Sequence, residues 1–218
     1  MRADMIIRSN TIVTCRDDVP WEVVDGYVAV RKDLIMAVAP GEVPPQLLGP
    51  ETIVIEARGK TVIPGLIDPH THLIHGGSRE HELQLKLKGA SYLEILASGG
   101  GILSTVDKTR SASREELKAQ AVQSLNQMLR HGTTTVEAKS GYGLDMETEL
   151  KCLEIGQELN GEHPIDIINT YMGAHAIPPE YQGNTEGYIQ FMIQQVMPTV
   201  AQKGLAEFMD VFCEEGVF

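Results

Sequence analysis

The stretch "VIPGLIDPHTHLIHGG", residues 62–77, separates two parts of the chain that have different secondary-structure patterns. Before it, short apolar runs alternate with turn-rich stretches and no helical period occurs, which predicts a small β unit. After it, strand-like apolar runs alternate with amphipathic segments, the pattern of parallel strands joined by crossover helices. We therefore predict an α/β unit after strands at 5–13, 26–31, 34–39 and 52–57.

The second part of the chain predicts four strands that alternate with helices. Ser113 and Glu116 form a capping box before the first long helix. A closed barrel of parallel strands needs eight of them, so four strands indicate either an open sheet or the first half of a (β/α)8 barrel. The strands are expected at 66–73, 134–139, 165–173 and 206–212, and the helices at 114–130, 147–160 and 186–203.

Composition and charge limit the possible partners of this protein. Among 218 residues, 18 basic and 30 acidic ones give a formal net charge of −12, which argues against nucleic acid as a partner. No stretch approaches the roughly 20 apolar residues of a membrane span, so no membrane association is expected. Cys15, Cys152 and Cys213 are too few and too far apart for a disulfide framework. We expect a cytoplasmic protein in which Cys213 is buried.

His70 and His72 are the first candidates for a functional site. Residues i and i+2 of a strand point to the same face, so both imidazoles are expected together at the carboxyl end of the first parallel strand. Neutral imidazole suits zinc and iron(II), and a catalytic zinc site usually has three protein ligands and a water. The alternative is two polar residues hydrogen-bonded at the end of the sheet, but Asp68 and the preceding Pro64 and Gly65 favour a metal site.

Three further side chains follow strands at the same end of the sheet. Arg79 can hold a carboxylate with two parallel hydrogen bonds, or it can be a solvated surface arginine. Tyr142 stands between glycines in "SGYG", where it can either reach a ligand or lie on the surface of a turn. His175 follows the third strand, and a lone histidine of this kind is either structural or part of the site.

Several blocks of the sequence resemble a known family. The block at 62–73 resembles the first barrel strand of the amidohydrolase superfamily. The remaining blocks are similar to one family within it, the imidazolonepropionases of histidine degradation, and together they cover essentially the whole chain. These blocks are "GGSRE" (76–80), "SGGGILSTV" (98–106), "EAKSGYGL" (137–144), "MGAHAIPPEY" (172–181) and "DVFCEEGVF" (210–218).

The resemblance implies both a fold and an activity. The implied fold is the N-terminal half of an amidohydrolase-type TIM (β/α)8 barrel, preceded by part of a small β-sandwich domain. Residues 1–60 would form the partial sandwich, and residues 61–218 the first four βα units of the incomplete barrel. The implied activity is metal-dependent hydrolysis of 4-imidazolone-5-propanoate to N-formimidoyl-L-glutamate, by a homodimer when the protein is full length.

The resemblance also implies roles for individual residues. His70 and His72 would bind one divalent metal ion, Zn(2+) or Fe(2+/3+). Arg79 would hold the carboxylate of a small anionic heterocyclic substrate, and Tyr142 would contact that substrate. His175 would bind substrate beside the metal and act in catalysis without being a metal ligand. Tyr92 is a weaker candidate for the same pocket.

Other ligands of the implied metal centre are expected outside this sequence. In the family a third histidine, a general-base glutamate and a metal-binding aspartate follow later strands, and the sequence ends before any of them. Asp210, Glu214 and Glu215 match none of those positions. We therefore expect the 218-residue chain alone to be inactive and to bind metal weakly.

The remaining polar candidates receive simpler interpretations. Lys139 ends the second strand, earlier than the carboxylated lysine of two-metal amidohydrolases, so it is expected to be structural or an ion-pair partner. We assign His75, His81, His131 and His163 to loops, helix caps or the surface. Two other functions stay open from the sequence: another amidohydrolase, such as a deaminase or cyclic amidase, and a non-catalytic amidohydrolase-like binding module.

Overall fold

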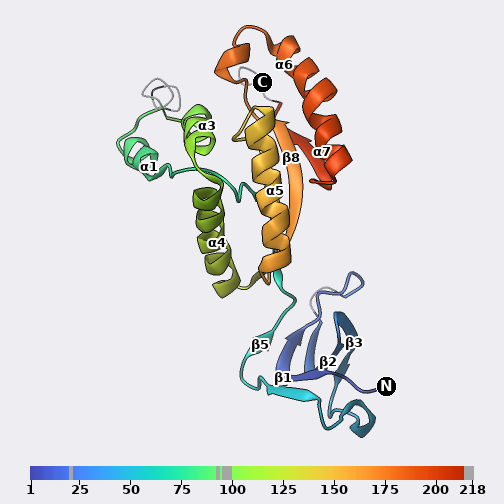
Figure 1. Cartoon of the computed structure of the whole chain (residues 1–218). Coiled ribbons are helices and arrows are strands. Elements are labelled where there is room, and N and C mark those ends of the chain that lie inside the picture. The colour runs from blue at the N-terminus through green and yellow to red at the C-terminus, as the bar shows by residue number, and fades with distance from the viewer. Residues whose placement is uncertain (20–21, 92–93, 95–99, 214–218) are drawn as a thin grey trace. The chain divides into compact units, whose positions relative to one another are not determined.

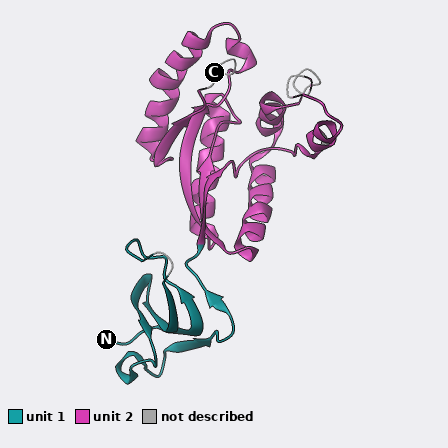
Figure 2. Cartoon of the chain, turned by 180° about the vertical axis from the view of Figure 1, so that it is seen from behind, with its two compact units in different colours: residues 1–65 teal, residues 66–218 magenta. Residues whose placement is uncertain are grey.

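The structure is a computed structural model that describes residues 1–19, 22–91, 94 and 100–213. The chain divides into two compact units, Met1–Gly65 and Leu66–Phe218 (Figure 2). Within the described residues, no helix is both long enough and apolar enough to cross a membrane. Each unit is described by itself.

The first unit is built around one twisted sheet, as the alternating apolar pattern predicts. Strands β1, β2 and β3 pair antiparallel, whereas β4 and β5 both run parallel to β1. Ile6, Tyr27 and Val43 are buried in its core. The sheet order is β3-β2-β1-β4, with strands β1 (Met5–Val13), β2 (Val23–Arg31), β3 (Leu34–Pro40), β4 (Ile53–Glu56) and β5 (Thr61–Val62), and a short 3-10 turn η1 (Pro45–Leu47).

The second unit contains a curled sheet of four parallel strands in the order β6-β7-β8-β9. The α/β class and the parallel arrangement of the predicted strands are confirmed. All four strands run parallel, so their carboxyl ends meet at one edge of the sheet. Figure 1 shows β8 with helix α5 (Met146–Glu162) packed against it. The strands are β6 (Leu66–Thr71), β7 (Thr133–Lys139), β8 (Asp166–Ala174) and β9 (Phe208–Val211).

Helices connect these strands and pack against the sheet. The predicted helix 114–130 is confirmed with its capping box, in which the Ser113 amide donates to Glu116 over 2.8 Å. Two helices were not predicted, α1 and α3, in the connection between β6 and β7. The helices are α1 (Glu80–Leu87), α3 (Ile102–Ser111), α4 (Arg114–Arg130), α5 (Met146–Glu162), η2 (Pro179–Tyr181), α6 (Thr185–Phe191), η3 (Met192–Val196) and α7 (Met197–Lys203).

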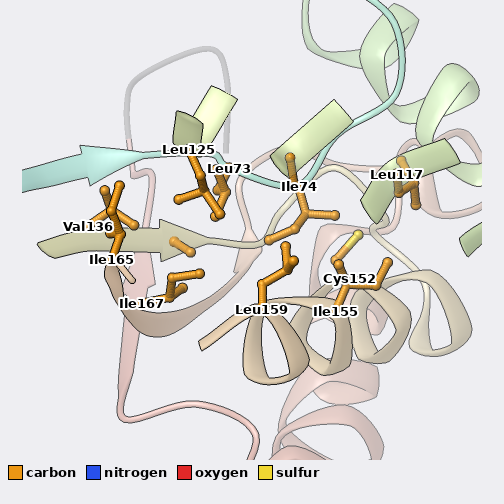
Figure 3. Packing of buried hydrophobic residues seen from close by; sticks show 12 residues of the cluster. Leu73, Ile74, Leu117, Leu125, Val136, Cys152, Ile155, Leu159, Ile165 and Ile167 are labelled. Atoms are coloured by element: carbon orange, nitrogen blue, oxygen red, sulfur yellow. The ribbon is translucent and has the colours of Figure 1, made fainter. Parts of the chain in front are cut away.

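The main core of this unit lies between the sheet and helices α4 and α5 (Figure 3). Apolar side chains of both helices meet those of the strands there, and Cys152 is buried among them. The expectation that Cys213 is buried is wrong, because its side chain is exposed. The cluster contains Leu73, Ile74, Leu117, Ala121, Leu125, Val136, Ala138, Cys152, Ile155, Leu159, Ile165 and Ile167.

The helix predicted at 186–203 contains a wider turn in its middle. Residues of η3 have π-type hydrogen bonding, and α-helical residues stand on both sides. Pro198 has no N–H, so it cannot donate the i→i−4 hydrogen bond that a regular α-helix requires there. A π turn next to the proline is a known way for a helix to accommodate this loss.

Asn169 joins three elements of the second unit through its side-chain amide. Its Nδ2 donates to the backbone oxygens of Leu153 in α5 and Leu205 before β9, over 2.7 and 2.9 Å. Gly156 of α5 faces this amide so closely that a Cβ added there would lie 2.2 Å from Asn169 Oδ1. The close approach of α5 to β8 therefore requires glycine at position 156.

We expect Gly156→Ala to lower the free energy of unfolding by about 1–3 kcal/mol, because a methyl group at this position overpacks the helix–sheet contact. Gly161→Ala is the matched control in the same helix, since a Cβ there meets nothing within 4 Å. Alanine favours helix, so the control should be neutral or stabilising by up to about 1 kcal/mol. Urea denaturation of both variants measures the difference, and equal midpoints would contradict this account of the packing.

Candidate active site

Three side chains predicted from separate strand ends meet at the carboxyl edge of the parallel sheet. His72 follows β6, Tyr142 follows β7, and His175 follows β8. The imidazole rings of His72 and His175 stack with centroids 4.5 Å apart, and the Tyr142 ring lies 4.6 and 5.1 Å from them. The structure therefore brings together three residues that are spread over more than 100 positions of the sequence.

His70 and His72 differ in their surroundings, although the sequence predicts an equivalent pair. His70 belongs to β6 and is exposed, whereas His72 lies beyond the end of the strand and is half-buried. The pairing of β6 with β7 is irregular between Asp68 and Thr71, which interrupts the simple alternation of side chains. Besides burial, a positive charge on His70 would lower the pKa of both His72 and His175.

The chemistry of His72 suits a metal ligand. Burial, together with the repulsion that a positive charge on His175 would add, lowers the pKa of His72 to about 3, so its ring is neutral. Its Nδ1 atom is buried and has no hydrogen-bond partner among the residues that the structure describes. A neutral imidazole nitrogen without a partner is the group that zinc and iron bind. Across the described ranges, however, no group of three or more His, Cys, Asp or Glu side chains is placed to hold a metal ion.

His175 is fixed in one orientation by the loop that carries Tyr142. Its Nδ1 lies 2.9 Å from the backbone oxygen of Gly141. A carbonyl only accepts hydrogen bonds, so Nδ1 carries the proton and Nε2 of the neutral ring is an acceptor. Burial lowers the pKa of His175 and favours this neutral form.

Arg79 lines a pocket of about 280 Å³ together with His72 and Tyr142. Its Nε and Nη2 donate to the two carboxylate oxygens of Glu82 over 2.9 and 2.7 Å. Glu82 is buried, and its Oε1 also accepts a hydrogen bond of 2.8 Å from the Gly101 amide. This bidentate pair, which the sequence did not indicate, holds the guanidinium in a fixed position at the wall of the pocket.

Two more residues of this pocket were not selected from the sequence. His75 was assigned to a loop, and it does lie in the loop after β6, but it also lines the pocket with its ring 6.2 Å from that of Tyr142. Thr105 of α3 lines the pocket as well. The sequence placed His75 in a loop and did not predict α3, so neither residue could be assigned to the pocket.

Glu149 shapes the loop that carries Tyr142. Its Oε1 accepts hydrogen bonds from the backbone amides of Gly141, Gly143 and Leu144 over 3.1, 2.8 and 3.0 Å, and Oε2 accepts from Gly141 over 3.1 Å. Burial raises the pKa of Glu149, and hydrogen bonds from Ser140 and these amides oppose that shift. A charged residue on the buried face of α5 was the sequence signal that could have identified it.

Lys139 has the structural role that the sequence predicts. Its Nζ donates to Glu137 over 2.8 Å and to Asp210 over 2.7 Å, which links β7 to β9. The hydrogen bond from Lys139 lowers the pKa of Asp210 and keeps this carboxylate ionised. Tyr92, the weaker candidate for the pocket, lies outside the described residues, as do Glu214 and Glu215, which match none of the family's ligand positions.

Residues 61–178, more than half of the chain, match the sequence profile of the amidohydrolase family. The chain belongs to this family. Members of the amidohydrolase family generally use a divalent metal ion, and the neutral ring of His72 with its unpartnered nitrogen agrees with that chemistry.

Several relatives of this amidohydrolase carry the same name. The imidazolonepropionase of Treponema denticola is 62% identical over 193 residues, which are 88% of this chain and 47% of that protein. Imidazolonepropionases of Alkaliphilus metalliredigens and Streptococcus pyogenes are 58% and 55% identical, each over 89% of this chain and 46% of the relative. The chain thus spans about half the length of the curated relatives it matches.

A solved structure shares the fold of this amidohydrolase. N-isopropylammelide isopropylaminohydrolase from Burkholderia multivorans has a TM-score of 0.51 over 96% of this chain and 44% of its own, at 15% sequence identity. At this identity the likeness concerns the fold alone. It agrees with an α/β unit whose parallel strands form part of a barrel.

We expect Glu149→Gln to destabilise the protein by about 1–3 kcal/mol, since it replaces one acceptor oxygen with an amide donor facing backbone donors. Hydrogen exchange at the amides of residues 141–144 should accelerate more than exchange at the amides of β8. Glu147→Gln is the control, because Glu147 is exposed in the same helix. If the two variants unfold at the same urea concentration, Glu149 does not organise this loop.

Proposed function

We propose that the protein hydrolyses the cyclic amide-like C–N bond of 4-imidazolone-5-propanoate to give N-formimidoyl-L-glutamate, a step of histidine degradation. The observation that carries this proposal is the shared pocket of Arg79, His72 and Tyr142. In this pocket the cation of Arg79 can bind a carboxylate, and the neutral ring of His72 lies beside it. The pocket lies at the C-terminal ends of the strands, where enzymes with a (β/α)8 barrel have their active sites. The names of the relatives support the same reaction.

In this proposal His70 and His72 bind one divalent ion, Zn(2+) or Fe(2+/3+). Such an ion, when bound, lowers the pKa of a water from about 15.7 toward 7 and so supplies hydroxide at neutral pH. The neutral state of His72 keeps its ring nitrogen available as a ligand. Two imidazoles are fewer than the three protein ligands of a usual catalytic site, so the described residues account for part of the coordination sphere.

Arg79 is proposed to attract and orient the propanoate group of the substrate. Its bidentate pair with Glu82 fixes the plane of the guanidinium before any ligand arrives. A fixed cation restricts where the carboxylate can lie, and it thereby positions the ring for attack. This preorganisation avoids the loss of side-chain freedom that a mobile arginine would undergo on binding.

His175 and Tyr142 are proposed to act on the imidazolone ring. With its Nδ1 proton donated to Gly141, His175 can accept a hydrogen bond from a ring N–H at Nε2. The Tyr142 hydroxyl is a donor that can stabilise negative charge as the ring carbon becomes tetrahedral. His175 therefore has a catalytic role in this proposal, and both residues contact substrate.

The finer domain organisation and the assembly also belong to this proposal. We propose that residues 1–60 form part of a small β-sandwich domain, and that residues 61–218 form the first four βα units of the barrel. The sheet of β1 to β5 and the four parallel strands support these assignments. We also propose that the full-length protein is a homodimer and that it is located in the cytoplasm.

The complete gene product should convert 4-imidazolone-5-propanoate to N-formimidoyl-L-glutamate, as followed by liquid chromatography and mass spectrometry. Dialysis against a chelator should abolish turnover, and adding back Zn(2+) or Fe(2+) should restore it. His72→Ala should remove both turnover and tightly bound metal. Turnover of other cyclic amides or amino-heterocycles, with none of this substrate, would overturn the proposal in favour of another amidohydrolase activity.

We expect Arg79→Lys to reduce kcat/KM on the order of 10- to 100-fold, because lysine cannot reproduce the planar bidentate geometry of arginine. The matched control is Arg114→Lys, since Arg114 binds Glu154 and Glu158 on the surface between α4 and α5. That variant should retain wild-type kinetics. Equal kinetics for the two variants would exclude the proposed role of Arg79.

A further inference from the structure

The hydroxyl of Thr105 is a polar group of the pocket wall that the proposed function does not use. Thr105 is 4% exposed and lines the same pocket as Arg79 and Tyr142. Its Oγ1 is buried, and it has no hydrogen-bond partner among the residues that the structure describes. A buried hydroxyl without a hydrogen-bond partner destabilises the folded state, so its presence needs an explanation. A ligand that forms the missing hydrogen bond is one such explanation.

Thr109, one helical turn further along α3, has the hydrogen bonds that the hydroxyl of Thr105 lacks. The hydroxyl of Thr109 donates to the backbone oxygen of Thr105 over 2.7 Å, which is the usual bond of a helical threonine to residue i−4. It also accepts a hydrogen bond of 2.9 Å from the Gly76 amide. Thr109 is thus satisfied within the protein, whereas Thr105 in the same helix is not.

Glu82 fixes the position of Thr105 relative to Arg79. One oxygen of this buried carboxylate accepts hydrogen bonds both from Arg79 Nε and from the amide of Gly101, directly before α3 begins at Ile102. Val106, the residue after Thr105, is buried in a cluster with Ala174 and other apolar residues. The start of α3 and the guanidinium are therefore anchored to the same group.

We propose that Thr105 is a substrate-binding residue whose hydroxyl donates a hydrogen bond to the carboxylate of a small anionic heterocycle held beside Arg79. This inference rests on the proposed function and deepens it. A carboxylate can accept several hydrogen bonds, so one group can bind the Arg79 cation and the Thr105 hydroxyl together. The bound ligand supplies the partner that Thr105 lacks, and the pocket gains selectivity for heterocycles with a carboxylate side chain.

The test compares two stable probes by calorimetric titration of the complete gene product: 3-(imidazol-4-yl)propanoate, which carries the carboxylate, and 4-propylimidazole, which does not. Thr105→Val keeps the shape but removes the hydroxyl. It should weaken binding of the propanoate probe about 10-fold, because a hydrogen bond to a charged group is lost. Binding of 4-propylimidazole should be nearly unchanged, and Thr105→Ser, which retains a hydroxyl, should restore most of the affinity.

Thermal unfolding separates this binding role from a structural one. Thr105→Val should unfold at the wild-type temperature or above it, because valine removes a buried hydroxyl that has no described partner. Thr109→Val is the control: it loses the bonds to Thr105 and Gly76 and should unfold at a lower temperature, without changing the preference between the probes.

Each outcome bears on one of the two claims. If wild-type protein binds the propanoate probe and Thr105→Val binds it equally well, the role of Thr105 is overturned while the proposed function stands. If Thr105→Val lowers the unfolding temperature and weakens both probes alike, the hydroxyl is structural. If the wild type binds neither probe, the proposed substrate class fails, and the assignment of Thr105 fails with it.

Discussion

The carboxylate of Glu149 accepts hydrogen bonds from the backbone of the loop that carries Tyr142, and the geometry of the site depends on this arrangement. Amides in a tight loop cannot all bond to one another, and their burial without acceptors would be costly. One buried carboxylate satisfies three of them. Because the Gly141 carbonyl of that loop also bonds to His175, Glu149 influences side chains that follow two different strands.

Charged groups near the pocket are held in the same manner, by partners inside the protein. Glu82 binds Arg79, and Lys139 binds both Glu137 and Asp210. A site built in this way is ordered before a ligand enters, so little conformational freedom remains to be lost on binding. The free energy of desolvating these ions is instead lost on folding, and losing one partner of a buried pair would destabilise the folded state.

The sequence predicts those features that follow from local chemistry. The start of α4 is set by the Ser113 capping box, and the convergence of His72, Tyr142 and His175 follows from parallel strands ending at one edge. Helix α1 was missed because Leu83, Leu85 and Leu87 alternate with polar residues, which is the period of a strand rather than of a helix. The different burial of His70 and His72 depends on irregular strand pairing, and the partners of Glu149 depend on a loop folding back, so neither can be read from periodicity.

The π turn at η3 has a consequence for insertions and deletions. Tyr188, Met192, Val196 and Val200 are all buried and stand four residues apart, but they serve two different apolar clusters. In a regular α-helix this spacing drifts by about 40° per step, so the last residue would leave the buried face. The wider turn absorbs part of that drift, as a one-residue insertion would. Deleting one residue of η3 would restore a regular helix in which Val200 keeps nearly its present face, so this helix should tolerate a one-residue deletion at η3 better than within its α-helical turns.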